Sequence, residues 1–339
     1  MNLHNKINKD ILKQRLLESN EPRTTLSFYK YWPIKNPRFF RDHLYLSLEP
    51  IGVLGRIYVA SEGINAQISV PTLNLDAFKE TLFSILFLDG IRLNEAVEDN
   101  GKSFIKLIIK VRPKIVADGI DDPTFNSWDF GKHLSASEFN EITSKPETIL
   151  VDMRNHYESE VGHFENAIVP DVDTFREELK FVVEHLADKK DQPLVMYCTG
   201  GIRCEKASAW MKHNGFKDVY QLEGGIIKYA QDIKKQGLPN KFKGKNFVFD
   251  ERLGERISED ITAHCHQCGT LWDTHTNCKN PGCNLLFLQC PQCGTKYDGC
   301  CSDECKDIYH LPQDIQKELR KHKDSGIRIF SKGRFKIEV

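Results

Sequence analysis

The sequence predicts a chain of mixed α/β and α+β class in three parts: an α+β domain, an α/β domain with a parallel sheet, and a cysteine-rich region that binds metal. Three observations support this prediction. Strand and helix patterns follow the order β-α-β-β-α-β over the first third of the chain, and strands alternate with helices over the middle third. All of the 11 cysteines except Cys198 and Cys204 fall between residues 265 and 305. A chain of 339 residues is also longer than one ordinary hydrophobic core requires.

The N-terminal elements follow a polar leader, which we assign to residues 1–22. The expected elements, in order, are a strand at 24–32, a helix from Asn36-Pro37 to about Gly52, strands at 55–63 and 64–71, a helix at 75–87 capped by Asn74, and a strand at 103–111. This order matches a split βαβ motif, so we predict a ferredoxin-like domain over residues 23–118.

The central elements follow a linker at residues 119–133, which has no hydrophobic periodicity. The expected elements are a helix begun by a Ser135 and Glu138 capping box, a strand from residue 148, a helical stretch near Tyr157, a helix at 174–186, a strand at 194–197, a helix ending near Gly215, a strand at 219–225 and a helix at 226–236. Such alternation favours a parallel sheet with helices on both faces, and we assign it to residues 134–237. Residues 238–262 are rich in lysine and irregular, so we predict a basic linker there.

Cys198 stands at the carboxyl end of the strand at 194–197, where parallel sheets bind their ligands. The loop that follows is Thr199, Gly200, Gly201, Ile202 and Arg203, and a helix begins directly after it. Loop amides and a helix N-terminus favour negative charge on sulfur, and such settings lower a cysteine pKa from about 8.5 to roughly 3.5–7.5. We therefore predict a nucleophilic thiolate in an anion-binding cradle. A buried cysteine that only packs on a strand is the alternative.

The cysteine cluster, in a region that we assign to residues 263–310, contains two Cys-x-x-Cys pairs, which are typical of metal sites. We predict two tetrahedral structural zinc sites, one from Cys265, Cys268, Cys278 and Cys283, the other from Cys290, Cys293, Cys301 and Cys305. Cys300 is left over. A cross-braced pairing, a ligand from His264 or His266, and an iron–sulfur cluster are alternatives. Residues 311–339 are expected to form a helix and a short basic strand.

Composition and motifs narrow the function. The formal net charge is −1, so a polyanion could bind only at local basic patches. Two basic patches predict RNA contacts. One follows the central domain and contains Lys241, Lys243 and Lys245, and the other interleaves with aromatic residues in the tail and contains Arg328, Lys332, Arg334 and Lys336. A solvated charged face explains both patches equally well. No signal peptide or membrane-spanning run is visible, which predicts a cytoplasmic protein without a membrane partner. No nicotinamide, Rossmann-type flavin or ATP motif is present.

Four segments resemble the ordered signatures of a rhodanese domain: Val151 to Arg154, Gly162 to Ala167, Cys198 to Arg203, and Val219 to Gly225. The resemblance implies that Cys198 is catalytic, that Arg203 closes the loop, and that Asp152 and Arg154 lie nearby at the end of the sheet. Thr199 stands where common rhodanese loops have arginine, which weakens the case for thiosulfate as substrate. His163 and Glu165 have the spacing of an iron-binding facial triad, but in a rhodanese signature this histidine is structural.

The combination of a ferredoxin-like domain, the loop CTGGIRCEKAS and the segment CHQCGTLWDTHTNCKNPGC resembles the tRNA uridine-34 hydroxylase family over nearly the whole chain. This resemblance implies an oxidoreductase that uses molecular oxygen to form 5-hydroxyuridine at the wobble position in the anticodon loop of tRNA, with Cys198 essential. One alternative is a sulfurtransferase that carries a persulfide on Cys198, and another is a zinc-stabilised RNA-binding module without catalysis. Cys204 is either a resolving thiol or a packed helix cysteine.

Overall fold

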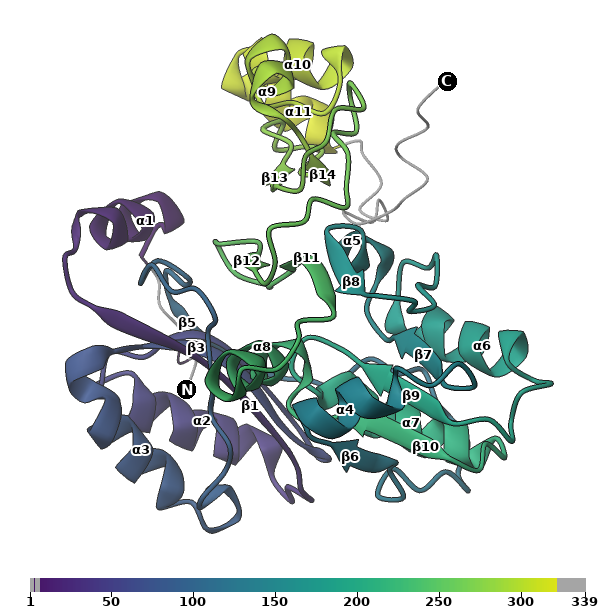
Figure 1. Ribbon diagram of the computed structural model, residues 1–339. Helices are drawn as coiled ribbons and strands as arrows, with labels where there is room; N and C mark the ends of the chain where they lie inside the picture. The colour runs from purple at the N-terminus through teal and green to yellow at the C-terminus, as the bar shows by residue number, and fades with distance from the viewer. Residues whose placement is uncertain (1–2, 4–6, 322–339) are drawn as a thin grey trace.

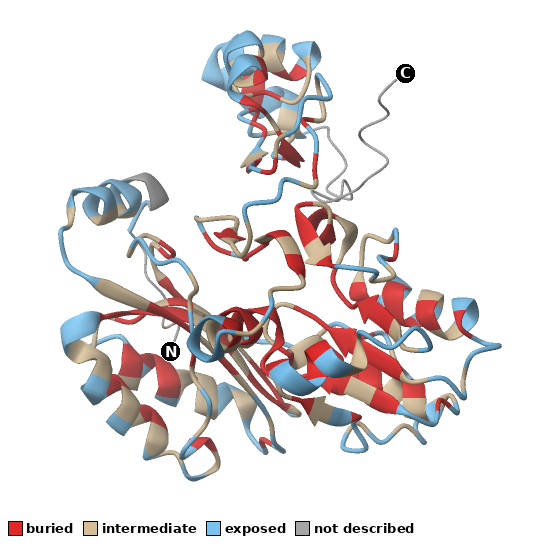
Figure 2. Cartoon of the chain, viewed as in Figure 1, coloured by how far each residue is buried: buried red, intermediate tan, exposed pale blue. Residues whose placement is uncertain are grey.

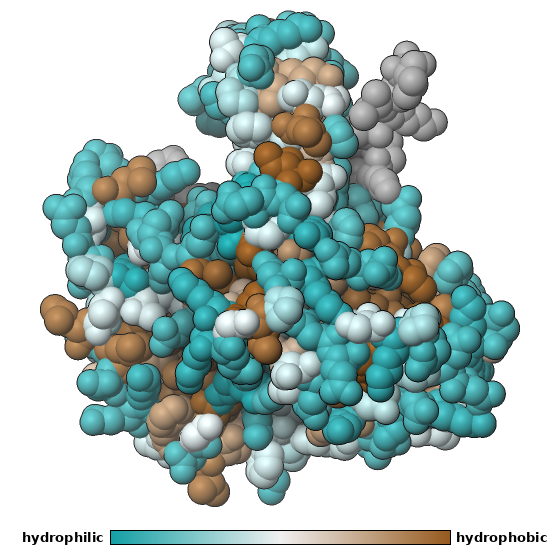
Figure 3. All heavy atoms as spheres, in the orientation of Figure 1, coloured by the Kyte–Doolittle hydropathy of each residue, from teal (hydrophilic) through white to brown (hydrophobic). Residues whose placement is uncertain are grey.

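The computed structural model describes residue 3 and residues 7–321, and these form three parts (Figure 1). The N-terminal domain lies beside the central domain, and a C-terminal lobe that contains α9, α10 and α11 extends beyond them, with a contact to the central domain through His266 and Glu160. Figure 2 shows that buried residues concentrate in the sheets and in the helix faces against them. Polar side chains cover most of the face drawn in Figure 3, and hydrophobic ones gather there in separate patches.

The N-terminal domain is a five-stranded sheet of order β4-β1-β3-β2-β5 with two helices on one face. Its strands are β1 (Arg23–Tyr31), β2 (Leu54–Ala60), β3 (Gly63–Pro71), β4 (Asn94–Glu95) and β5 (Leu107–Val111), and its helices are α2 (Pro37–Leu48), α3 (Leu75–Phe83) and the short 3₁₀ turns η1 (Thr72–Asn74) and η2 (Leu86–Leu88). Alternate residues such as Ile57 and Val59 are fully buried against Leu44 and Phe78 of the helices. The intervening residues of β1, β2 and β3 face the central domain instead.

Three expectations for this region need correction. The strand at 107–111 does not close the ferredoxin-like motif, because the two-residue β4 pairs antiparallel with β1 in that position, whereas β5 pairs parallel with β2 at the opposite edge. The leader contains a helix, α1 (Lys9–Glu18). Asn74 stands at the N-cap position of α3, but its side chain makes no capping hydrogen bond and donates to the Ile51 carbonyl instead.

The central domain is a fully parallel sheet of order β6-β10-β9-β7. Its elements are β6 (Lys132–Leu134), α4 (Ala136–Ile142), β7 (Ile149–Asp152), α5 (His156–Ser159), α6 (Phe175–His185), β9 (Leu194–Tyr197), α7 (Ile202–His213), β10 (Val219–Leu222) and α8 (Gly225–Gln236). In β9, Leu194 and Met196 pack with α6 and α7, while Val195 and Tyr197 pack with α4 and α8. The prediction of helices on both faces is therefore confirmed.

A small sheet replaces the basic linker expected after the central domain. β8 (Gly162–Phe164) pairs antiparallel with β11 (Phe242–Asn246), which pairs with β12 (Glu255–Arg256). The rings of Phe164 and Phe242 are 5.1 Å apart in an edge-to-face contact. The expectation of irregular chain here is wrong, because pairing with a strand 80 residues earlier gives these residues hydrogen-bond partners that local propensity does not reveal.

The C-terminal lobe has little hydrophobic core of its own. It comprises β13 (His275–Asn277), β14 (Leu286–Leu288), α9 (Pro291–Lys296), α10 (Asp303–His310) and α11 (Gln313–Lys321). Leu285 and Phe287 are buried chiefly among cysteines. The basic strand expected in the tail lies outside the described residues. Within residues 7–321, no helix is long and apolar enough to span a bilayer.

Candidate active site

The Cys198 loop forms where β9 gives way to α7. Gly201 adopts φ +99°, a left-handed conformation that favours glycine, and its N–H donates a hydrogen bond to Cys198 Sγ at 3.2 Å. A Cβ atom at Gly201 would lie 2.9 Å from Tyr29 Oη of the N-terminal domain. The two domains therefore meet directly at the loop.

Gly225, at the start of α8, lets the backbone of that helix contact the Cys198 loop. With φ +65°, it lets α8 approach so closely that the Ile226 N–H donates to the Cys198 carbonyl at 3.0 Å. A Cβ atom at Gly225 would lie 2.5 Å from that same carbonyl oxygen. Gly201, which the sequence analysis placed in the loop, and Gly225, which it did not, thus shape the cradle.

The Cys198 thiol is ionised at neutral pH although it is only 1% exposed. Burial raises its pKa, but a hydrogen bond from the Cys204 thiol, the charge of Arg203 and the backbone amides of residues 203 and 204 together lower the pKa to about 6. Burial and this hydrogen bond raise the pKa of Cys204, which lies fully buried on α7. Cys204 is therefore packed within the helix and lies close enough to stabilise the neighbouring thiolate.

Arg203 is fixed by a carboxylate that the sequence did not single out. Its guanidinium makes two hydrogen bonds to Glu158, at 2.5 and 2.8 Å, and lies 3.4 Å from the Thr199 hydroxyl. Glu158 is fully buried at the third position of α5, where it also accepts from the Asn155 N–H. The capping-box spacing of Asn155 and Glu158 was visible in the sequence, but its contact with the loop was not.

Asp152 and Arg154 lie behind the site and do not line it. Both are fully buried and form a bidentate ion pair, with Nε–Oδ1 at 2.8 Å and Nη2–Oδ2 at 2.6 Å. Arg154 also donates to the Gly162 carbonyl at 2.6 Å. These contacts tie β7 to β8, so the pair supports the sheet end at which the loop sits.

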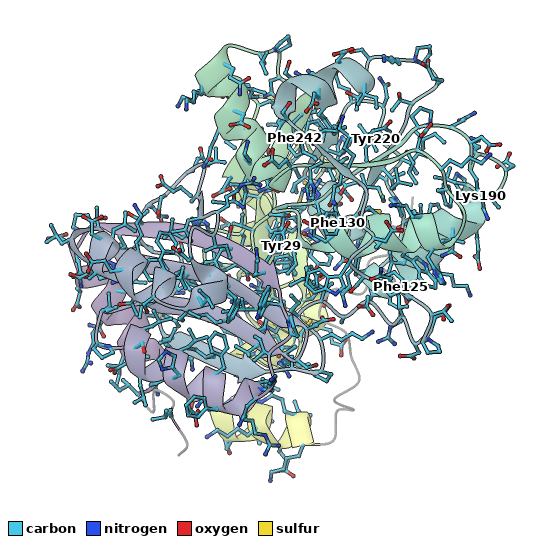
Figure 4. The ribbon with its side chains drawn as sticks, turned by 90° about the horizontal axis from the view of Figure 1, so that it is seen from below. Tyr29, Phe125, Phe130, Lys190, Tyr220 and Phe242 are labelled. Carbon is cyan, nitrogen blue, oxygen red and sulfur yellow. The ribbon has the colours of Figure 1, made fainter. Side chains whose placement is uncertain are left out.

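A cavity of about 520 Å³ opens beside Cys198. The Cys198 loop and Tyr157 form one wall, Phe249 and Arg252 lie on another side, and the free face of the N-terminal sheet completes it with Tyr29, Arg56, Tyr58, Asn65 and Gln67. Figure 4 shows Tyr29 where the two domains meet. The volume falls in the range typical of ligand pockets. The sheet-face residues were missed in the sequence, where their alternation with buried residues along β2 and β3 was the available signal.

Glu205 and Lys206, which follow the loop on α7, join the central domain to the N-terminal domain, although the sequence indicated only helix formers there. Glu205 accepts hydrogen bonds from Tyr29 and His133, both at 2.9 Å. Lys206 is 2% exposed and pairs with Asp118 and, at 2.6 Å, with Glu62. Buried ion pairs across this contact hold the N-terminal sheet over the thiolate.

We predict that alkylation of Cys198 by iodoacetamide follows its ionisation, with a midpoint near pH 6. Because the thiolate is the nucleophile, the rate should be constant above pH 7 and fall about tenfold per unit below pH 5. Arg203→Gln should shift the midpoint upward, while Arg203→Lys, which keeps the charge, should shift it less. Mass spectrometry of the modified peptide measures the rate, and a midpoint near 8.5 would contradict the assignment.

The eight predicted metal ligands form two sets, but not the two that were predicted. Cys265, Cys268, Cys290 and Cys293 make one set and Cys278, Cys283, Cys301 and Cys305 the other, with the sulfur atoms of each set within 4.8 Å of one another. The predicted pairing of neighbours along the chain is wrong, and the cross-braced alternative is correct. The β13–β14 hairpin explains this: Cys278 and Cys283 lie at its closed end, while the chain before β13 and after β14 meets at its open end.

The geometry of both sets fits a tetrahedral metal ion. Sulfur atoms around zinc at 2.3 Å stand about 3.8 Å apart, and Cys268–Cys290, Cys283–Cys301 and Cys301–Cys305 are separated by 3.6, 3.7 and 3.6 Å. His266 belongs to neither set, because its Nε2 bonds to Glu160 at 2.6 Å. Cys300 is buried beside the second set.

The other candidate residues have different partners. His163 Nδ1 bonds to the Ser159 carbonyl, and no metal-binding group among the described residues includes it or Glu165. Lys241 donates to the Asn140 carbonyl at 2.6 Å, Lys243 pairs with Glu165 at 3.2 Å, and Lys245 pairs with Asp273 at 2.9 Å. Carboxylates thus compensate the charges of Lys243 and Lys245. Arg328, Lys332, Arg334 and Lys336 lie outside the described residues.

Comparison with known proteins identifies each part of the chain. Family models match residues 23–115 as a UPF0176 acylphosphatase-like domain, residues 135–232 as a rhodanese-like domain, and residues 243–306 as a rhodanese C-terminal region. A tRNA uridine(34) hydroxylase from Pectobacterium carotovorum is 60% identical over 333 residues, which cover 98% of this chain and 94% of that protein. One from Photorhabdus laumondii is 58% identical over 337 residues, with 99% and 96% covered. The chain therefore belongs to the tRNA uridine(34) hydroxylase family.

Proposed function

We propose that this protein is an oxidoreductase that hydroxylates uridine 34 of tRNA to 5-hydroxyuridine, with dioxygen as co-substrate. The observation that carries the proposal is an ionised thiol, Cys198, on the wall of a cavity large enough for a nucleoside, in a chain about 60% identical to proteins of that name. Uridine 34 lies in a single-stranded loop, so its base can enter the cavity without breaking a duplex. A tRNA substrate supports a cytoplasmic location for the enzyme.

The chemistry begins with addition of the Cys198 thiolate to C6 of uracil, which makes C5 a nucleophilic enolate carbon. C5 then takes one oxygen atom of dioxygen, and the other oxygen atom leaves as water. The reaction consumes two electrons and two protons from an external reductant, for which a small thiol is a suitable class. Loss of the C5 proton and cleavage of the C6–S bond release 5-hydroxyuridine and restore the thiolate.

The surrounding residues support this sequence of steps. The Gly201 amide and the start of α7 stabilise the thiolate before addition and again when it leaves. Glu158 keeps Arg203 beside the loop, so positive charge stays near the reacting sulfur. Side chains from the N-terminal domain, the central domain and residues 248–255 surround the cavity on several sides, which reduces the water around the enolate.

We also propose that both cysteine sets bind zinc. Each offers four sulfur ligands and no open position, so the ions would be structural and would supply folding free energy to a lobe with a small core. No step of the reaction requires them.

A tRNA that carries 5-fluorouridine at position 34 should form a covalent complex with the protein. Fluorine at C5 cannot leave as a proton, so the Cys198 adduct should accumulate and appear as a slower band on a denaturing gel. Cys198→Ser should give no such band. If the wild-type protein hydroxylates normal tRNA but never forms the complex, addition at C6 is wrong even though the overall reaction stands.

A further inference from the structure

A second cavity, of about 570 Å³, adjoins the one beside Cys198. Tyr58, Ile115 and Ala117 line both cavities, so the two are neighbours at the N-terminal sheet. Arg112, just after β5, and Arg176, on α6, contribute to its wall. The second cavity is therefore built by both domains, like the first.

The wall of the second cavity carries a net positive charge, chiefly from the exposed Arg112 and Arg176. No carboxylate among the described residues pairs with Arg112 or Arg176, nor with Arg56 in the first cavity, whereas Arg154 and Arg203 each have a buried carboxylate partner. Lys114 also lines the second cavity, but it pairs with Asp118 at 2.6 Å. Asp121 is the single acidic residue in the wall. Arginine without a partner in a cavity favours an anion there.

Two features position these groups. Gly119, with φ +68°, leaves room for Arg176, since a Cβ atom there would lie 2.4 Å from Arg176 Nε. The guanidinium of Arg112 lies 5.5 Å from the ring centre of Tyr58, whose side chain is half-buried at the junction of the two cavities. Basic side chains beside an aromatic ring are the usual arrangement for binding single-stranded nucleic acid.

We propose that the second cavity binds the RNA backbone next to the target uridine. Arg112 and Arg176 contact two phosphate groups, and Tyr58 stacks on a neighbouring base while uridine 34 lies beside Cys198. This inference rests on the proposed function, which makes tRNA the substrate. It moves the RNA surface from the lysines after the central domain to the second cavity, which residues of both the N-terminal and the central domain line.

The test compares binding of full-length tRNA to the wild-type protein and to an Arg112→Gln/Arg176→Gln double variant at several salt concentrations. Loss of two phosphate contacts should raise Kd on the order of tenfold in 0.1 M salt. It should also reduce the slope of log K against log salt by about 1.4, at about 0.7 for each contact on a single strand. The matched control is Arg38→Gln, because Arg38 is exposed on α2, at the opposite face of the sheet. This variant should change neither Kd nor the slope.

Tyr58→Leu removes the ring without changing charge, so it should raise Kd at every salt concentration and leave the slope unchanged. Cys198 alkylation at pH 7 should be as fast in all these variants as in the wild-type protein, which shows that the site is intact. If the double arginine variant binds tRNA with the Kd and slope of the wild-type protein, the inference is wrong. The proposed function would still stand in that case, provided that the same wild-type preparation hydroxylates tRNA. If wild-type protein binds tRNA but forms no 5-hydroxyuridine, the proposed function fails and the slope still decides the inference.

Discussion

Replacing Cys198 with serine should abolish 5-hydroxyuridine formation. The hydroxyl of serine is protonated at neutral pH, so it lacks the charge that Arg203 and the loop amides stabilise on sulfur, and it cannot add to C6 of uracil. Loss of a covalent nucleophile typically lowers kcat by on the order of 10⁴–10⁶-fold, which is below detection for a tRNA modification. Mass spectrometry of tRNA nucleosides from a deletion strain, complemented with each variant, measures the effect.

Cys204→Ser is the matched control, because its hydroxyl can still donate a hydrogen bond to Cys198. We expect this variant to retain most of the modification. Complete loss in Cys204→Ser with a folded protein would instead indicate a resolving thiol. Unchanged 5-hydroxyuridine in the Cys198→Ser strain would show that the loop is not catalytic, and a thiosulfate-derived persulfide on Cys198 would favour sulfur transfer.

Removing zinc ligands in pairs should show which cysteines share an ion. In the cross-braced arrangement Cys268 and Cys293 belong to one site, so Cys268→Ser/Cys293→Ser should retain one zinc ion of the two. Cys268 and Cys283 belong to different sites, so Cys268→Ser/Cys283→Ser should lose both ions. Structural zinc contributes an apparent 10–16 kcal/mol to folding of small domains, so loss of both ions should unfold the lobe.

Metal analysis of the purified variants, together with limited proteolysis, measures this effect. The residues replaced are equal in number and kind, so the two variants control for each other. Loss of both ions in Cys268→Ser/Cys293→Ser and retention of one in Cys268→Ser/Cys283→Ser would contradict the cross-brace and support pairing along the chain. Iron in place of zinc would replace the proposed metal while leaving the ligand sets unchanged.

The cysteine at the strand end could be predicted because its chemistry is local. Cys198, its glycines and the following helix start are consecutive in the sequence, so the hydrogen bond from Gly201 and the lowered pKa follow from short-range geometry. The same reason made the Ser135–Glu138 capping box predictable. The pairing of β11 with β8 was not predictable, because it joins segments 80 residues apart.

The sequence by itself determined the three-part class, the place of a cysteine at the carboxyl end of a strand, and the eight cysteines whose sulfur atoms gather in two sets, because residue type and short spacing carry that information. Only the tertiary structure decided how the ligands divide between two ions, which carboxylate holds Arg203, and that the free face of the N-terminal sheet forms part of the Cys198 cavity. Those features depend on where separate segments meet in space. The β13–β14 hairpin separates cysteines that are neighbours in the chain. The contacts of Glu205 and Lys206 join the central domain to the N-terminal domain, and no local sequence pattern indicates this pairing of domains.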